Sequence, residues 1–236
     1  MKFLILLIVF FLHLEGSSFN LSQGNILNTD TKKESKISYN EMIRYMIQSN
    51  DPSQLFGVGV IYMNGIEDKD DSGLSISVDL EKALYYFNTS INKGYKKGNA
   101  IVGAFYLYNK NLSKISNSEN SAEIYLKKAI AANDISAYIY LSDLYNRQDK
   151  VEESINVLML GANQNDATAQ LMVAYMYNNG VYNEKSKKQL IYKNEKNALF
   201  FLNKACSNKN KSEKVKKTCF NSKEVIVESK FPEEVK

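Results

Sequence analysis

Histidine, the side chain that most often carries acid–base chemistry near neutral pH, occurs once in this chain, at His13. His13 lies within residues 1–18, where a basic start, an apolar run of about a dozen residues and several small residues are typical of a secretory signal peptide. We expect cleavage after Ser18. The alternative is an uncleaved anchor, although the run is shorter than the roughly 20 residues of a membrane span.

A mature chain without histidine has consequences for catalysis. It contains no Ser-His-Asp or Cys-His triad, and it offers no histidine ligand for zinc. The sequence therefore predicts a protein that is not an enzyme and that holds no metal or other cofactor.

One pair of residues has the spacing of a nucleophile motif. Ser90 and Lys93 form S-x-x-K, which is typical of penicillin-recognising enzymes, but the chain contains neither S-D-N nor K-T-G. Ser90 also falls at a small-residue position of a predicted helix. We therefore interpret it as a core residue and not as a nucleophile.

The acidic residues 67–79 have the spacing of a calcium-binding loop, with Gly73 at the turn position. However, Ser75 stands where such loops carry an apolar residue, and the last acidic residue is explained as the N-cap of a helix. We predict a solvated acidic loop without metal. The residues at the ligand positions are Asp68, Asp70, Ser72 and Asp79.

A helical repeat dominates the rest of the sequence and would position any functional side chain. Every second predicted helix carries a small residue and a tyrosine eight residues apart. Small residues let helix axes approach closely, and the tyrosine rings fill the space between neighbouring helices. The copies are Ala100…Tyr108, Ala137…Tyr145 and Ala169…Tyr177, with a weaker first copy, Gln54…Tyr62.

The repeat divides the chain into helix pairs. The first helices are predicted near 53–64, 98–110, 134–147 and 167–179, and the second helices near 79–93, 119–132, 150–164 and 194–208. Asn or Gly occupies the turn after each second helix, where we predict a left-handed backbone. These turn residues are Asn50, Gly94, Asn133 and Asn165.

The predicted domain boundaries follow from these pairs. A disordered lead-in occupies 19–36, the solenoid occupies 37–222, and a tail occupies 223–236. Within the solenoid, a half-repeat at 37–50 precedes pairs at 53–94, 98–133, 134–165 and 167–208.

The pattern resembles the Sel-one-like repeat (SLR) family, whose members are relatives of tetratricopeptide repeats. Residues 59–65 and 79–94 match the family pattern best, and the pair at 167–208 matches it nearly as well. The central pairs depart from it, because Phe105 and Ser142 stand where the family prefers glycine. The resemblance implies an all-α fold: a right-handed superhelix of antiparallel helix pairs, or α-solenoid.

The two cysteines, Cys206 and Cys219, suggest a disulfide if the protein enters an oxidising compartment. Their surroundings also resemble cysteine-rich SLR proteins, in which such cysteines link one repeat to the next. The alternative is a buried thiol at Cys206 and a free Cys219. With the signal peptide, these features predict a protein of the secretory pathway, located in the periplasm, in the endoplasmic-reticulum lumen or outside the cell.

The resemblance implies a scaffold or adaptor that binds a protein or an extended peptide. We expect no small-molecule substrate, no nucleic acid and no membrane span after cleavage. One alternative is a hydrolase of the cysteine-rich repeat type, which the missing histidine opposes. The other is a basic surface for acidic glycan, lipid or nucleic acid, because residues 184–218 hold eleven lysines, Lys185, Lys187 and Lys188 among them, against three glutamates.

The expected binding surface is the exposed side of the first helices, which line the inner curve of such solenoids. A ladder of amide and aromatic side chains there would bind the backbone of an extended peptide. The alternative is that asparagines near helix ends cap carbonyl groups. The predicted binding residues are Tyr106, Asn109, Asp143, Asn146, Tyr175 and Asn178.

Overall fold

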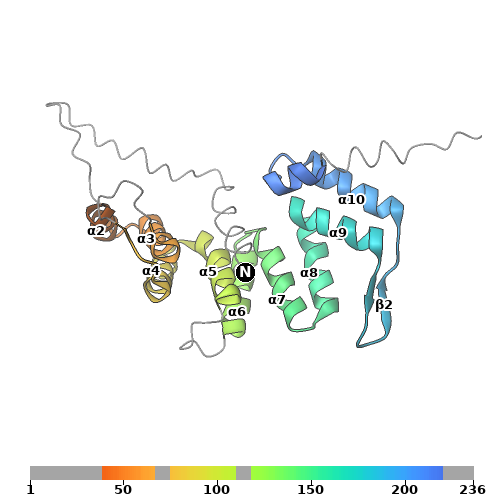
Figure 1. The fold of residues 1–236 in the computed structure, drawn as a ribbon, viewed down its shortest axis with the longest axis horizontal. Coiled ribbons are helices and arrows are strands. Elements are labelled where there is room, and N and C mark those ends of the chain that lie inside the picture. Colours follow the sequence, from red (N-terminus) through yellow and green to blue (C-terminus); the bar gives the residue numbers. More distant parts are fainter. Residues whose placement is uncertain (1–38, 67–74, 110–117, 220–236) are drawn as a thin grey trace, which may run out of the picture. The chain divides into compact units, whose positions relative to one another are not determined.

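The computed structural model describes residues 39–66, 75–109 and 118–219, and these are helical for most of their length (Figure 1). The predicted signal peptide, lead-in and tail, and residues 67–74 of the predicted solvated acidic loop, lie outside the described residues. The helices are α2 (Tyr39–Ser49), α3 (Pro52–Asn64), α4 (Leu80–Asn92), the short 3-10 helix η1 (Lys96–Gly98), α5 (Asn99–Tyr108), α6 (Ser118–Ala131), α7 (Ala137–Arg147), α8 (Val151–Asn163), α9 (Ala167–Asn179) and α10 (Glu195–Ser207).

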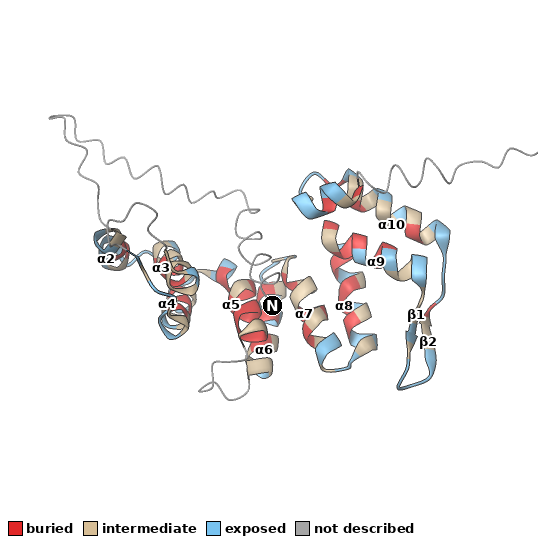
Figure 2. Cartoon of the chain, viewed as in Figure 1, coloured by how far each residue is buried: buried red, intermediate tan, exposed pale blue. Residues whose placement is uncertain are grey.

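Each helix packs against the helix that follows it, and buried residues occur along the helices (Figure 2). The strongest packing joins the two helices of a pair: α3 with α4, α5 with α6, α7 with α8 and α9 with α10. In addition, α5 contacts α7 and α7 contacts α9, so that successive first helices are neighbours. This arrangement confirms the predicted all-α solenoid of helix pairs.

The connection from α9 to α10 forms a β-hairpin. Its strands are β1 (Val181–Asn183) and β2 (Lys188–Ile191), which pair antiparallel. The strands alternate β-branched, aromatic and polar residues, a composition that favours a pleated backbone. Gly180, with φ of 74°, turns the chain out of α9 immediately before β1.

Local capping explains where the helices begin and end. The side chains of Asp51, Asp79, Asp166 and Asn194 accept hydrogen bonds from the first backbone N–H groups of α3, α4, α9 and α10. The predicted left-handed turns are also confirmed, because Asn50, Gly94, Asn133 and Asn165 all have positive φ.

The ends of the first helices show that the repeat register predicted for the second pair was wrong. The residues that end α3, α5, α7 and α9 each donate a backbone N–H to the carbonyl four residues earlier; they are Gly65, Asn109, Gln148 and Gly180. Three residues before these ends lie Tyr62, Tyr106, Tyr145 and Tyr177. The repeat tyrosine of α5 is therefore Tyr106, and the prediction of Tyr108 was wrong by two residues.

Side-chain packing supports the corrected register. The ring of Tyr106 stacks on Tyr125 of α6 at 5.7 Å between centroids. The same stacking joins the two helices of the first pair and of the last pair, through Tyr62 with Tyr86 at 5.8 Å and Tyr177 with Phe201 at 5.9 Å.

A glycine three residues before the repeat tyrosine lets the two helices of a pair approach closely. A Cβ on Gly59 would lie 2.5 Å from the ring of Phe87, and a Cβ on Gly103 would lie 2.6 Å from Leu126. Gly103, and not Phe105, is thus the family-type glycine of the second pair. In the third pair Ser142 takes this place, and its hydroxyl bonds to Ser154 of α8 at 2.8 Å.

The solenoid continues beyond α10 with a short helical segment at 213–219. Val215 is buried in a cluster with Ala167, Leu171 and Ala205, and a disulfide joins Cys206 of α10 to Cys219. The predicted disulfide is confirmed.

The close approach at Gly59 predicts a contrast between two alanine substitutions in α3. Gly59→Ala forces a Cβ into the Phe87 ring and should destabilise the protein by about 1–3 kcal/mol, as overpacking does. In Gly57→Ala the nearest atom is the flexible Met46 Cε at 2.8 Å, so we expect no loss, or a helix-propensity gain of up to ~1 kcal/mol. Urea unfolding followed by circular dichroism measures both; equal stabilities would contradict this packing.

The disulfide should hold the segment 213–219 in place, because a helix this short is marginal on its own. Replacing both cysteines by serine should cost about 3 kcal/mol, the value expected for a loop of this length. Limited proteolysis should then cut within residues 208–219 while α3 to α9 stay protected. Unchanged stability and unchanged protease resistance would show that the segment docks without the bond.

Candidate interaction surface

The six predicted binding residues do not share one environment. Tyr106 is 9% exposed and packs in the core, so the prediction that it lies on the surface was wrong. The physical reason is the register: Tyr106 is the repeat tyrosine that stacks between helices. Asn109 ends α5, and its side-chain Nδ2 donates to the carbonyl of Phe105, which is the capping role considered as the alternative.

The other four predicted residues lie on α7 and α9. Asn146 and Asn178 are exposed, and Tyr175 is 52% exposed. Asp143 is partly buried and bonded to protein groups. In the corrected register Asn146 and Asn178 remain equivalent, whereas Asn109 corresponds to Gln148. A ladder of three equivalent asparagines is therefore absent from α5, α7 and α9.

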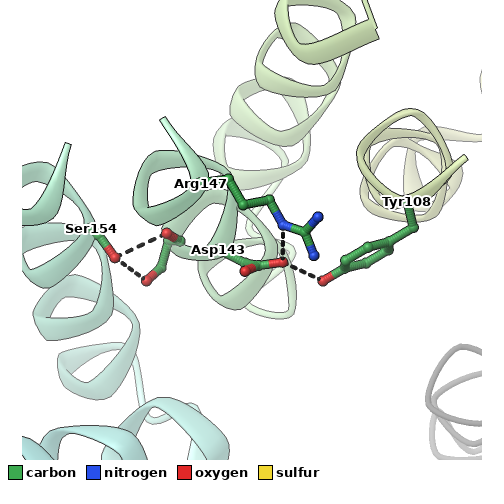
Figure 3. A network of polar contacts seen from close by, with 5 residues as sticks. Tyr108, Asp143, Arg147 and Ser154 are labelled. Atoms are coloured by element: carbon green, nitrogen blue, oxygen red, sulfur yellow. Dashed lines mark hydrogen bonds and ion pairs between the residues drawn. The ribbon is translucent and has the colours of Figure 1, made fainter. Parts of the chain in front are cut away.

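Tyr108, which does not occupy the repeat position, links α5 to α7 (Figure 3). Its hydroxyl donates to Asp143 Oδ2 at 2.9 Å, and its ring lies 6.2 Å from the ring of Tyr140 in an edge-on arrangement. The guanidinium of Arg147 lies 5.0 Å from the centre of the Tyr108 ring, and Arg147 Nε donates to Asp143 Oδ2 at 3.0 Å. Three residues on one stripe of α7 thus hold one tyrosine of α5.

This environment keeps the Tyr108 phenol protonated. Burial, and next the neighbouring Asp143 carboxylate, raise the pKa of Tyr108 well above its ordinary value near 10. Tyr108 therefore acts as a hydrogen-bond donor that fixes Asp143, and Asp143 in turn fixes Arg147.

The stripe of α9 that corresponds to this α7 stripe is exposed. Counted from the repeat tyrosines, Met172, Tyr175 and Asn179 are the equivalents of Tyr140, Asp143 and Arg147. Met172 is 39% exposed, Tyr175 is 52% exposed, and Asn179 is exposed. We call Met172, Tyr175 and Asn179 the α9 stripe. Arg147, the residue equivalent to Tyr108, turns back toward Tyr108 of α5.

The lysine-rich hairpin is largely neutralised by carboxylates. Lys185 pairs with Asp149 and Lys188 pairs with Glu152 at 3.3 Å, which ties the hairpin to the start of α8. Lys187 pairs with Glu184 at 3.2 Å within the hairpin turn. These exposed pairs contribute little stability, but they remove the concentrated positive charge that a basic binding surface requires.

Three further observations concern metal binding, the nucleophile motif and membrane-spanning helices. Among the described residues, no group of three or more His, Cys, Asp or Glu side chains is placed to hold a metal ion. Ser90 is fully buried and donates its hydroxyl to the carbonyl of Pro52, as expected for a core residue. None of the described helices is long and apolar enough to cross a membrane.

Sequence reasoning missed Tyr108, Arg147, Met172 and Asn179. The signal that could have found them is the helix-ending residue: alignment on Gly65, Asn109 and Gly180 places Tyr106 beside Tyr62 and Tyr177. That alignment also shows which residues on either side of each repeat tyrosine are equivalent from one helix to the next.

The fold defines a class of protein, the α-solenoids built from helix pairs, and comparison with solved structures narrows it further. The chain is similar to a Sel1 repeat protein from Oxalobacter formigenes, with a TM-score of 0.52 and 18% identity over 71% of this chain and 63% of that one. It is also similar to a protective antigen of uropathogenic Escherichia coli strains that displays an SLR fold, with a TM-score of 0.51 and 16% identity over 78% of this chain and 36% of the antigen.

The protein therefore has the SLR fold, and the resemblance seen in the sequence is confirmed at the level of the fold. The matched region is less than two thirds of either relative's length. No model of a known protein family and no curated protein matches the sequence.

The raised pKa of Tyr108 predicts a pH dependence of stability. Above pH 10 the unfolded chain releases this proton while the folded protein retains it, so the free energy of unfolding should fall as pH rises. Tyr108→Phe should lose about 1–2 kcal/mol at pH 7 with its bond to Asp143, and should show a shallower fall between pH 9 and 11. Denaturant titrations across this range test it, with Tyr175→Phe as control; parallel curves for wild type and Tyr108→Phe would contradict the assignment.

Proposed function

We propose that the protein is a non-catalytic helical-repeat scaffold that binds an extended segment of a partner protein on the first-helix surface of α7 and α9. The proposal rests on the exposure of the α9 stripe. It exposes a methionine, a tyrosine and an amide on one face of a helix whose other sides are packed. Tyrosine and methionine are enriched in the centres of protein interfaces.

The repeat itself explains why this stripe can receive a side chain from outside. The equivalent stripe of α7 holds the ring of Tyr108, so the same helix geometry is known to accommodate an aromatic side chain. On α9, Met172 and Tyr175 are partly exposed, so the equivalent position is accessible to a partner. Asn146 and Asn178, both exposed at the same end of these helices, supply amide groups for a partner's backbone.

We further propose that the scaffold acts outside the cytoplasm. The Cys206–Cys219 disulfide supports an oxidising compartment, and the apolar start of the sequence supports export. The ion pairs of Lys185, Lys187 and Lys188 argue against a basic binding surface at the hairpin itself.

Binding should depend on the α9 stripe and not on other exposed aromatic residues. Linear peptides selected from a displayed library against residues 19–236, with the disulfide intact, provide the probe. We expect Met172→Ser with Tyr175→Ser to weaken a selected peptide at least tenfold, because interface centres lose about 2 kcal/mol or more on truncation. Isothermal titration calorimetry measures the dissociation constants.

Tyr192→Ser is the matched control, because Tyr192 is 76% exposed but lies beyond the hairpin. It should bind the peptide as the wild type does. Failure of the selection, or equal binding by the stripe variant and the wild type, would contradict the proposed surface.

A further inference from the structure

The outward side of α10 combines lysines with an aromatic side chain. Lys196, Phe200 and Lys204 follow one another at intervals of four residues, so they lie along one side of the helix, away from the buried Ala198 and Ala205. Phe200 is 59% exposed although its side chain has no polar group. We call Lys196, Phe200 and Lys204 the α10 stripe.

The equivalent stripe of α4 has the exposed aromatic residue without the lysines. Counted from the small residues Ala83 and Ala198, its members are Glu81, Tyr85 and Thr89. Tyr85 is 64% exposed, about as much as Phe200. The two stripes therefore differ mainly in charge, and this difference allows a matched comparison.

The chain around the α10 stripe adds further positive charge. Residues 192–219 contain eight lysines and two glutamates. Among the ion pairs between described residues, only Lys216 of these eight lysines takes part, through Glu213. The lysines of the hairpin, by contrast, are all paired with carboxylates. The positive charge at this end of the solenoid is therefore not neutralised by the described residues.

The segment after α10 keeps part of this charge beside the helix. The Cys206–Cys219 disulfide and the buried Val215 hold the segment against α10 (Figure 1). The following residues, 220–236, contain three lysines and four glutamates, which is too small an excess of negative charge to neutralise this end. The exposed lysines of the segment are Lys209, Lys214 and Lys217.

The residue types favour a lipid surface over other anionic partners. Specific contacts to nucleic-acid phosphates and bases commonly use the planar donors of arginine, and residues 192–219 contain no arginine. Lysine acts as a point charge, which suits the anionic headgroups of a membrane surface. Phe200 and Tyr192, which is 76% exposed, are side chains typical of the boundary between headgroups and acyl chains.

We infer that the end of the solenoid formed by α10 and residues 208–219 docks on a membrane surface that contains anionic phospholipids. Lys196 and Lys204 lie near the headgroup phosphates, and Phe200 enters the boundary between headgroups and acyl chains. This site goes beyond the proposed function and does not involve the α9 stripe. The scaffold is thereby held at a membrane while its first helices bind the partner segment.

Co-flotation with lipid vesicles tests the inference on the disulfide-bonded protein of residues 19–236, which lacks the apolar start of the chain. Vesicles with equal parts of phosphatidylglycerol and phosphatidylcholine supply the anionic surface, and vesicles of phosphatidylcholine alone are neutral. We expect binding to the anionic vesicles only, and weaker binding as the salt concentration rises, because salt screens the attraction of lysines to headgroups. Equal binding to both kinds of vesicle, or binding to neither, would overturn the inference.

Two pairs of lysine substitutions separate the α10 stripe from the total charge. Lys196→Gln with Lys204→Gln should weaken binding about tenfold or more, because each lysine near an anionic surface contributes several-fold to affinity. Lys93→Gln with Lys97→Gln removes the same charge from exposed lysines between α4 and α5, and should weaken binding by less than about threefold. Equal losses in the two variants, with both shown by circular dichroism to be folded, would contradict docking through α10.

A tryptophan reporter locates the contact, because the chain contains no tryptophan. With anionic vesicles, the emission of Phe200→Trp should shift to shorter wavelength and be quenched by lipids with brominated acyl chains. Tyr85→Trp, at the equivalent position of α4, is the matched control and should show neither effect. No response from Phe200→Trp, or an equal response from Tyr85→Trp, would overturn the assignment. A response of Phe200→Trp to duplex DNA but not to vesicles would replace the lipid surface by a nucleic acid.

Discussion

The structure depends on the close approach of the two helices within each pair. A glycine or another small residue three positions before the repeat tyrosine lets the second helix come near enough for its own bulky residue to fill the space. At Gly59 and Gly103 even one additional carbon would meet a side chain at 2.5–2.6 Å. The tyrosine rings then stack on the partner helix, which fixes both the register of the pair and the outward direction of the neighbouring residues.

The amino-acid sequence predicts much of the fold because the repeated positions carry residue types with distinct conformational and packing preferences. Asn50, Gly94, Asn133 and Asn165 tolerate the left-handed backbone, and all four adopt it. The helix ranges follow from apolar periodicity and lie close to the observed helices. The hairpin at 181–191 could not be predicted in the same way, because a single insertion carries no repeat signal to compare.

The binding residues were harder to predict, since the surface of a solenoid depends on a register that varies by one or two residues. In α5 two tyrosines compete for the repeat position, at 106 and 108, and both have a small residue eight positions earlier. Packing decides between them: Gly103 allows the approach that places Tyr106 inside, so Tyr108 points toward α7. The interaction of Tyr108 with Asp143 and Arg147 spans two helix pairs and has no counterpart in local sequence patterns.

These features connect the core to the proposed binding surface. The stripe of α7 formed by Tyr140, Asp143 and Arg147 holds Tyr108, whereas the equivalent α9 stripe is exposed. The most direct test is hydrogen–deuterium exchange of the protein with and without a selected peptide. The account predicts slower exchange in residues 137–147 and 167–179 when the peptide is bound. Protection confined to the hairpin at 181–191 or to the second helices would contradict it.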